Sequence, residues 1–129
     1  MTEAVLDASA LLAMLRKEPG RERVSAIIND AAVSVVNLSE VVDYFAQNGL
    51  VESEIRRLLD PLPFVRVAFD EGIAYAAGLL RPLTRPAGLS FADRACLALA
   101  KKLGVPALTT DQAWSRIAAA VGVEVELIR

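Results

Sequence analysis

Short apolar runs alternate with segments of helical periodicity along the whole chain, and this alternation limits the possible folds more than any other feature. Five runs have the length of buried or edge strands. They are residues 4–6, 32–36, 64–69, 105–109 and 123–128. Helical patterns occupy the stretches between them, at residues 9–16, 21–29, 37–48, 53–59, 70–80, 91–103 and 112–120. Parallel strands need such crossover connections, so the order predicts an α/β fold. We expect a three-layer α/β/α sandwich with a mostly parallel central sheet.

Residues with special backbone or capping properties mark where these elements begin and end. Asn37 or Ser39 is expected to cap the third helix, and Ser90 is expected to cap the helix that Gly104 ends. Residues 81–88 contain two prolines and a glycine and predict a loop. The last strand, residues 123–128, is expected at an edge of the sheet.

Length and composition predict one globular domain, residues 1–129, in the cytoplasm. A chain of 129 residues fits one domain. Hydrophobic residues make up 54% of it, which predicts a large core together with apolar surface kept for a partner. No run approaches the roughly 20 apolar residues of a membrane span. Asp7 interrupts the first apolar run and Glu3 precedes it, unlike an export signal. Cys96 is the only cysteine, so no disulfide is expected.

The chain has no histidine, and this absence excludes several kinds of active site. Ser-His-Asp triads, histidine-based acid–base ribonuclease chemistry and histidine-ligated zinc all need that side chain. Any bound metal must therefore have oxygen ligands, which favours Mg²⁺ or Mn²⁺. The net charge of −2 does not by itself favour nucleic-acid binding. The positions of individual charges are therefore more informative about function than their sum.

Four acids occupy similar positions relative to the predicted elements. Asp7 and Asp111 directly follow strands, and Glu40 and Asp93 are expected in the first turns of helices. In an open parallel sheet, ligands bind at the carboxyl ends of the strands, where the strand order reverses. Carboxylates gathered there repel one another, and a divalent cation removes that cost. Each acid taken singly could instead cap a helix or interact favourably with the positive end of a helix dipole. Only the joint pattern of the four acids indicates a metal site.

Four segments resemble the motifs of PIN-domain nucleases, in the same order along the chain. Val5-Leu6-Asp7-Ala8-Ser9-Ala10 resembles the first motif, and Asn37-Leu38-Ser39-Glu40-Val41 resembles the second. The third is Gly88-Leu89-Ser90-Phe91-Ala92-Asp93-Arg94-Ala95, and the fourth is Ala107-Leu108-Thr109-Thr110-Asp111-Gln112-Ala113-Trp114. The length of the chain and its helix at 94–103 are similar to those of VapC-type toxins of bacterial toxin–antitoxin pairs. The resemblance spans essentially the whole chain.

The resemblance implies a PIN fold, Mg²⁺- or Mn²⁺-dependent endoribonuclease activity, inhibition by a cognate antitoxin, and homodimers. By position, the catalytic and metal-site acids would be Asp7, Glu40, Asp93 and Asp111. Ser9 and Thr110 resemble hydroxyl residues that orient the carboxylates or waters. Some relatives carry a fifth acid shortly after the fourth motif. This chain has Trp114 in that region, so four acids are assigned.

Three arginines flank the third motif and are candidates for holding RNA phosphates, although solvated loop charges fit them equally well. They are Arg81, Arg85 and Arg94.

Rival functions remain open. A haloacid-dehalogenase-type phosphatase would need a second aspartate where Ser9 stands. A receiver-type phosphoacceptor could use Asp70, but it would need a lysine where Thr110-Asp111 stands. A PIN-like binding module without activity is the third alternative.

Overall fold

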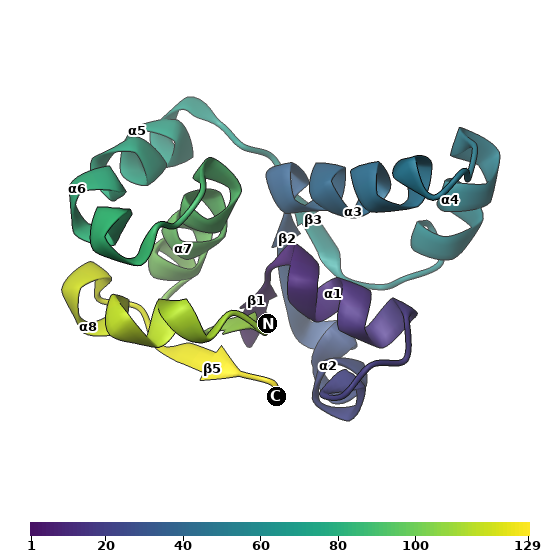
Figure 1. Ribbon diagram of the computed structural model, residues 1–129, viewed down its shortest axis with the longest axis horizontal. Helices are drawn as coiled ribbons and strands as arrows, with labels where there is room; N and C mark the ends of the chain where they lie inside the picture. Colours follow the sequence, from purple (N-terminus) through teal and green to yellow (C-terminus); the bar gives the residue numbers. More distant parts are fainter.

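The computed structural model describes all residues, 1–129, and has one parallel sheet at its centre (Figure 1). The strand order is β3-β2-β1-β4-β5, and every neighbouring pair is parallel. The strands are β1 (Ala4–Leu6), β2 (Ala31–Ser34), β3 (Val65–Val67), β4 (Ala107–Thr109) and β5 (Val125–Leu127). The predicted α/β class is confirmed, and the last strand lies at an edge as expected.

The three central strands are short and fully buried, which explains their unbroken apolar sequences. In the register, Val5 of β1 lies between Ala32 of β2 and Ala107 of β4. The order of the strands reverses between β1 and β4, because the chain reaches β4 only after it has built β2 and β3 on the other side. The carboxyl ends of β1 and β4 therefore form the switch point, where open α/β sheets bind their ligands.

Helices cover both faces of the sheet and complete the three layers (Figure 1). One layer holds α1, α2, α3 and α4, and the other holds α5, α6, α7 and α8. Their bounds are α1 (Ala8–Leu15), α2 (Arg21–Ile27), α3 (Val35–Gln47), α4 (Glu52–Leu59), α5 (Glu71–Leu79), α6 (Arg81–Thr84), α7 (Phe91–Leu103) and α8 (Ala118–Val121). Short 3₁₀ turns at Ile28–Asp30, Arg85–Ala87 and Gln112–Arg116 connect them.

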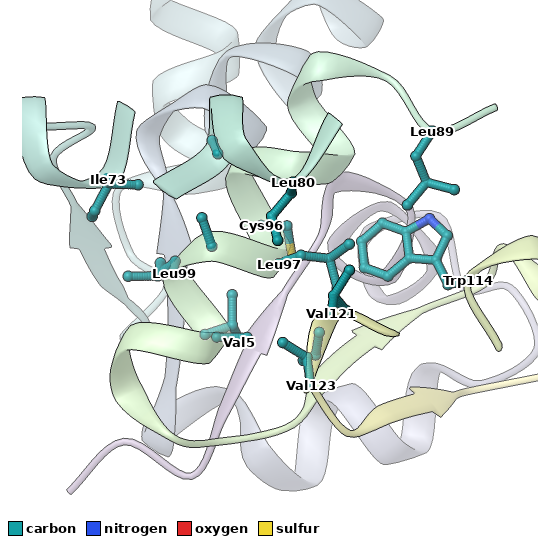
Figure 2. Close-up of a cluster of buried hydrophobic side chains, with 14 of the residues drawn as sticks. Val5, Ile73, Leu80, Leu89, Cys96, Leu97, Leu99, Trp114, Val121 and Val123 are labelled. Carbon is teal, nitrogen blue, oxygen red and sulfur yellow. The ribbon is translucent and has the colours of Figure 1, made fainter. Parts of the chain in front are cut away.

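Each face of the sheet has its own hydrophobic core. The core under α5 and α7 contains Trp114 and Leu97, with Cys96 as a small buried member (Figure 2). The core on the other face contains Leu6 and Leu11. Burial on this scale, at about 25 cal/mol per Å² of apolar surface, supplies the main driving force for folding. No helix of the chain has the length and apolarity to cross a bilayer.

Several predicted boundaries are wrong, and in two places the error has a clear cause. Val35 and Val36 look like the end of a strand, but they are the first residues of α3, and Ser34 rather than Asn37 or Ser39 caps that helix. The predicted loop at 81–88 contains α6 and a 3₁₀ turn, because proline is tolerated in the first turn of a helix. The predicted helix at 112–120 is divided into a 3₁₀ turn and the short α8.

Candidate active site

The four acids singled out in the sequence line one pocket at the carboxyl ends of β1 and β4. Its volume is about 340 Å³. Asp7 follows β1 and Asp111 follows β4, whereas Glu40 comes from α3 and Asp93 from the first turn of α7. A fifth acid, which the sequence analysis did not select, completes the acidic lining. The lining residues are Asp7, Ala8, Ser9, Leu12, Glu40, Asp43, Asp93 and Asp111, with no lysine or arginine among them.

Asp7 is the most firmly held of these acids, because both of its carboxylate oxygens accept hydrogen bonds inside the fold. The Ser9 hydroxyl donates to Oδ1 at 2.7 Å, and the backbone N–H of Ala10 donates to the same atom at 2.8 Å. The Thr109 hydroxyl donates to Oδ2 at 2.6 Å. Asp7 thus caps α1 and also joins β1 to β4. This network fixes the carboxylate at the switch point.

Burial raises the pKa of Asp7 to about 6, because the charged form loses its hydration. The three hydrogen bonds lower the pKa but do not cancel this effect, and the nearby charge of Asp93 raises it further. The Asp7 side chain is only 5% exposed. A positive charge brought into the pocket would favour the ionised form, so this carboxylate is suited to a cationic ligand.

Glu40 depends on Asn37, which lies one turn earlier on the same helix. The amide nitrogen of Asn37 donates to Glu40 Oε1 at 3.1 Å and to the backbone carbonyl of Ala92 at 3.1 Å. Asn37 is fully buried, and its Oδ1 has no hydrogen-bond partner. Its two acceptors fix the orientation of the amide, so Asn37 holds Glu40 against the start of α7. The expected position of Glu40 in the first turn is wrong, since α3 begins at Val35.

The pKa of Glu40 is raised, and partial burial is the largest cause. The hydrogen bond from Asn37 lowers it, while the charges of Asp93 and Asp43 raise it. The charge of Asp93, in the third motif, therefore disfavours the ionised form of Glu40, in the second motif.

Asp93 shares its carboxylate with the N-terminus of α7. The Asp93 Oδ2 atom accepts from the backbone N–H of Ser90 at 2.8 Å, and the Ser90 hydroxyl accepts from the N–H of Asp93 at 3.2 Å. This reciprocal pair is a capping box. Burial raises the pKa of Asp93, the Ser90 hydrogen bonds lower it, and the charge of Asp111 raises it. The helix start predicted at Ser90 is confirmed and brings Asp93 to the pocket.

Asp111 caps the 3₁₀ turn after β4, and its backbone is tied to Asp7 through one hydroxyl. Its Oδ1 accepts from the N–H of Ala113 at 2.9 Å. Its own N–H donates to Thr109 Oγ1 at 3.0 Å, and that hydroxyl donates onward to Asp7. The distance between the first and fourth acids is therefore set by backbone as well as side-chain contacts.

The pocket has the donor chemistry of a divalent-cation site, although its carboxylates are not arranged as a ready set of ligands. No group of three or more His, Cys, Asp or Glu side chains in the chain is placed to hold one metal ion. Helix caps and the local hydroxyls hold the carboxylates of Asp7, Asp93 and Asp111. The lining nevertheless offers only oxygen donors and carries uncompensated negative charge, which suits hard cations such as Mg²⁺ or Mn²⁺.

One of the two hydroxyl residues that the sequence analysis assigned beside Asp7 differs in the structure. Ser9 contacts the Asp7 carboxylate as expected, and its oxygen accepts from the N–H of Thr110 at 2.9 Å. The second hydroxyl on Asp7 belongs to Thr109, whereas Thr110 contributes its backbone N–H. Thr109 is fully buried at the end of β4. The alternation of side chains along a strand could have separated these two threonines.

Asp43 is the acid that sequence analysis missed. It lies three residues after Glu40, a spacing that puts two side chains on the same side of a helix, and it lines the pocket. Its carboxylate accepts from the side-chain amide of Gln47 at 3.1 Å. The additional acid of this pocket therefore lies on α3 and not after the fourth motif, where this chain has Trp114.

The three arginines near the third motif differ in exposure. Arg81 and Arg85 are exposed. Arg94 is 7% exposed and donates from Nη1 to the Ala77 carbonyl at 3.1 Å, so its guanidinium is used inside the fold. Asp70, which a receiver-type site would need, caps α5 by accepting from the N–H of Ile73 and does not line the pocket.

Comparison with solved structures gives matches over the whole chain. The DNA-bound VapBC complex of Salmonella typhimurium has a chain that is 19% identical, with full coverage of both chains and a TM-score of 0.77. A toxin–antitoxin complex from Klebsiella pneumoniae is 19% identical, with 98% of each chain covered and a TM-score of 0.75. FitAcB from Neisseria gonorrhoeae is 23% identical, with 97% of each chain covered and a TM-score of 0.70. At these identities the likeness concerns the fold.

Family assignment depends on the sequence itself. No curated protein sequence matches the chain. The family model of the PIN domain matches residues 4–120, which include all four acids of the sequence motifs and the strands that carry or precede them. The chain therefore belongs to the PIN-domain family, a family of nucleases.

Proposed function

We propose that this protein is an endoribonuclease that hydrolyses RNA phosphodiester bonds with Mg²⁺ or Mn²⁺, and that it is the toxin of a toxin–antitoxin pair. One observation carries the catalytic part of this proposal. Five carboxylates line a single pocket that has no basic residue, so its charge is complemented only by a cation from solution. Membership of the PIN-domain family supports nuclease chemistry, and the similar folds of toxin–antitoxin complexes support the biological role.

In the proposed site, Asp7, Glu40, Asp93 and Asp111 hold the cation. A divalent ion supplies neutralisation of the phosphate charge and a more acidic water for attack on phosphorus. Other side chains of the protein hold these carboxylates in position. Ser9 and Thr109 hold the Asp7 carboxylate by hydrogen bonds, and Asn37 holds Glu40 toward α7. Arg81 and Arg85, which are exposed and lie just before the third motif, are the proposed contacts for RNA phosphates.

This chain has a groove between α3 and α4 that suits the proposed antitoxin. Its volume is about 380 Å³, and apolar residues such as Leu50 and Ile55 line it. Its lining also contains charged residues of both signs: Glu52, Arg56, Asp60 and Arg66. An amphipathic peptide would bury apolar side chains in such a groove and pair its charges at the rim. We propose that a segment of the antitoxin binds here.

Cleavage of a total RNA pool by the purified chain tests the catalytic proposal most directly. We expect cleavage in Mg²⁺ or Mn²⁺, none in excess EDTA, and mapped ends that cluster at particular sites. Asp7→Asn and Asp93→Asn are each expected to reduce the rate at least a hundredfold. Asp30→Asn is the matched control, because Asp30 is exposed at the opposite end of the sheet, where its carbonyl accepts from Glu3.

The outcome also separates the alternatives. Cleavage that persists in EDTA would overturn the cation mechanism. RNA binding without cleavage in any divalent cation would favour a PIN-like binding module. Phosphate release from small phosphomonoesters, with RNA left intact, would favour a phosphatase. Cutting of DNA in preference to RNA would leave the site in place and change the substrate class.

A further inference from the structure

Phe91, the first residue of α7, is an exposed aromatic residue at the end of the helix that reaches the acidic pocket. It is 52% exposed, and it precedes Asp93 by two residues, which is about 3 Å along the helix axis. Side chains of a helix tilt toward its N-terminus, so the ring stands at the same end of α7 as the pocket. Residues two apart do not share a side of a helix, and Phe91 is not part of the pocket lining. The ring therefore lies beside the pocket.

Two neighbouring side chains hold this ring in place. Phe69 follows β3 at the carboxyl edge of the sheet and packs edge-to-face with Phe91, with the ring centroids 5.4 Å apart and an interplanar angle of 81°. The guanidinium carbon of Arg94 lies over the Phe91 ring at 5.9 Å from its centroid. Arg94 is buried and anchored by its bond to the Ala77 carbonyl. The contacts of Phe91 are thus on its inner side, and its outer side is open to solvent in a defined orientation.

The charge of the protein makes an uncharged contact important for an RNA ligand. The net charge of the chain is −2, and the pocket is lined by five carboxylates and no basic residue. RNA phosphates that flank the pocket therefore meet a negative surface. Stacking of a base on an aromatic ring needs no charge on the protein, and the loss of such a ring weakens binding about tenfold or more. Base contacts beside the pocket would supply affinity that the charges there do not.

The surroundings of Phe91 suit a nucleobase better than the surface of another protein. Gly88 and Ser90, which precede it, are exposed and offer no large apolar side chain. Leu89 and Ala92 are apolar but buried. A stable protein interface covers roughly 800 Å² of each partner, which is far more than one aromatic ring. A single ring of fixed orientation matches the flat face of a base.

We propose that Phe91 stacks with a base of single-stranded RNA, namely the base next to the phosphate that enters the acidic pocket. This inference rests on the proposed nuclease function and names a contact to its substrate. Single-stranded RNA is the class that fits, because its bases can be splayed out onto aromatic side chains, whereas the bases of a duplex remain stacked on one another. Phe91 is then a substrate-binding residue that sets where the strand lies relative to Asp93.

Fluorescence anisotropy of a short, fluorescein-labelled single-stranded RNA tests this contact. All proteins in the series carry Asp7→Asn, so that the RNA stays intact. Phe91→Leu is expected to raise the dissociation constant about tenfold, because leucine keeps apolar contact with Phe69 but has no flat ring. Phe91→Trp is expected to bind at least as tightly as the parent. Tyr75→Leu is the matched control, because it removes an exposed ring from α5, which does not line the pocket, and it should leave binding unchanged.

RNAs that each lack one base identify the stacked nucleotide. At one position, loss of the base is expected to weaken binding to the protein with Phe91 about tenfold and to have no effect on the Phe91→Leu protein. Circular dichroism checks that each variant is folded. Equal dissociation constants for Phe91→Leu and its parent would overturn the proposal, as would equal losses from the missing base in both proteins. So would a changed molar mass of Phe91→Leu in light scattering with RNA binding unchanged, because the ring would then contact a protein.

Cleavage kinetics in the chain with Asp7 intact separate this proposal from the nuclease proposal. Phe91→Leu is expected to raise KM for RNA about tenfold and to change kcat by less than about threefold. Cleavage with an unchanged KM would overturn the stacking contact and leave the nuclease function in place. Binding that depends on Phe91 and on one base, without cleavage in any divalent cation, would support the stacking contact and overturn the nuclease function.

Discussion

Asp7 combines two properties that conflict in the absence of a cation. It is buried at the switch point of the sheet, and it is ionised in neutral solution, at a pH above its pKa of about 6. Its hydrogen bonds from Ser9, Ala10 and Thr109 reduce the cost of this charge without removing it. Carboxylates with strongly perturbed pKa values cluster at functional sites, and this supports the role proposed for Asp7.

Asp7→Asn is expected to stabilise the cation-free protein at neutral pH. The pKa of Asp7 is raised from 3.8 to about 6, so above pH 6 the folded state bears a penalty of about 3 kcal/mol that the unfolded state lacks. The penalty disappears as the pH falls from 6 to 4, because the folded protein takes up the proton first. The stability difference between variant and wild type is therefore largest at pH 7 and smallest near pH 4. Urea unfolding at both pH values measures it, and a variant less stable at pH 7 would make Asp7 a structural residue.

Asn37→Leu is expected to separate the positioning of Glu40 from folding. The substitution removes a buried oxygen that has no partner along with two donated hydrogen bonds, so the free energy of unfolding should change by less than about 2 kcal/mol. Because the Asn37 hydrogen bond lowers the pKa of Glu40, its loss raises that pKa. The acidic limb of the pH–rate profile for RNA cleavage should move to higher pH. Asn29→Leu, at an exposed asparagine, should leave the profile unchanged.

At the scale of elements, α7 is the helix whose ends were best predicted, and its N-terminus serves both the fold and the pocket. Ser90 and Gly104 stand at its two ends as expected, with Gly104 in the left-handed conformation at φ 68°. The start of α3 was missed, because β-branched valines favour strands in isolation while Ser34 supplies a cap that overrides them. The sequence thus predicts both ends of a helix when a capping residue stands before it and a helix-ending residue such as glycine stands after it.

Ser90→Ala is expected to destabilise the protein by about 1 kcal/mol, because it removes the hydroxyl that accepts from the N–H of Asp93. Ser90→Thr keeps an acceptor and should recover most of that loss. Thermal unfolding of the three proteins gives the comparison. Equal melting temperatures for Ser90→Ala and wild type would show that the capping box contributes little in solution.

At the scale of the whole molecule, the sequence predicted which acids share a pocket, because strand ends in a parallel sheet share one edge. It did not predict how the carboxylates are held. The positions of Asp43 and Thr109 depend on how α3 and β4 are turned toward the pocket. Asn37 is one of two cap candidates in the sequence, whereas in the structure it joins α3 to α7. These contacts cross between distant elements, and no pattern local to one segment encodes them.

Divalent cations are expected to stabilise the folded protein, because they bind the assembled pocket and not the unfolded chain. At a concentration 100 times the dissociation constant the gain is about 2.7 kcal/mol, or a rise in melting temperature of roughly 10 °C. Differential scanning calorimetry with Mn²⁺ and with EDTA measures this rise. Asp30→Asn should retain it, and Asp93→Asn should lose most of it. No change in the wild-type melting temperature with either Mg²⁺ or Mn²⁺ would count against the cation site.

The neighbouring positions of β1 and β4 in the sheet have a consequence for how the protein is made. Residues 7 and 111 meet only after a strand from the last quarter of the chain has been inserted beside the first strand. A growing polypeptide on the ribosome therefore lacks half of its switch point until residues 107–111 have been made. A product terminated before residue 107 has the first acid of the pocket but lacks the strand that brings Asp111 beside it.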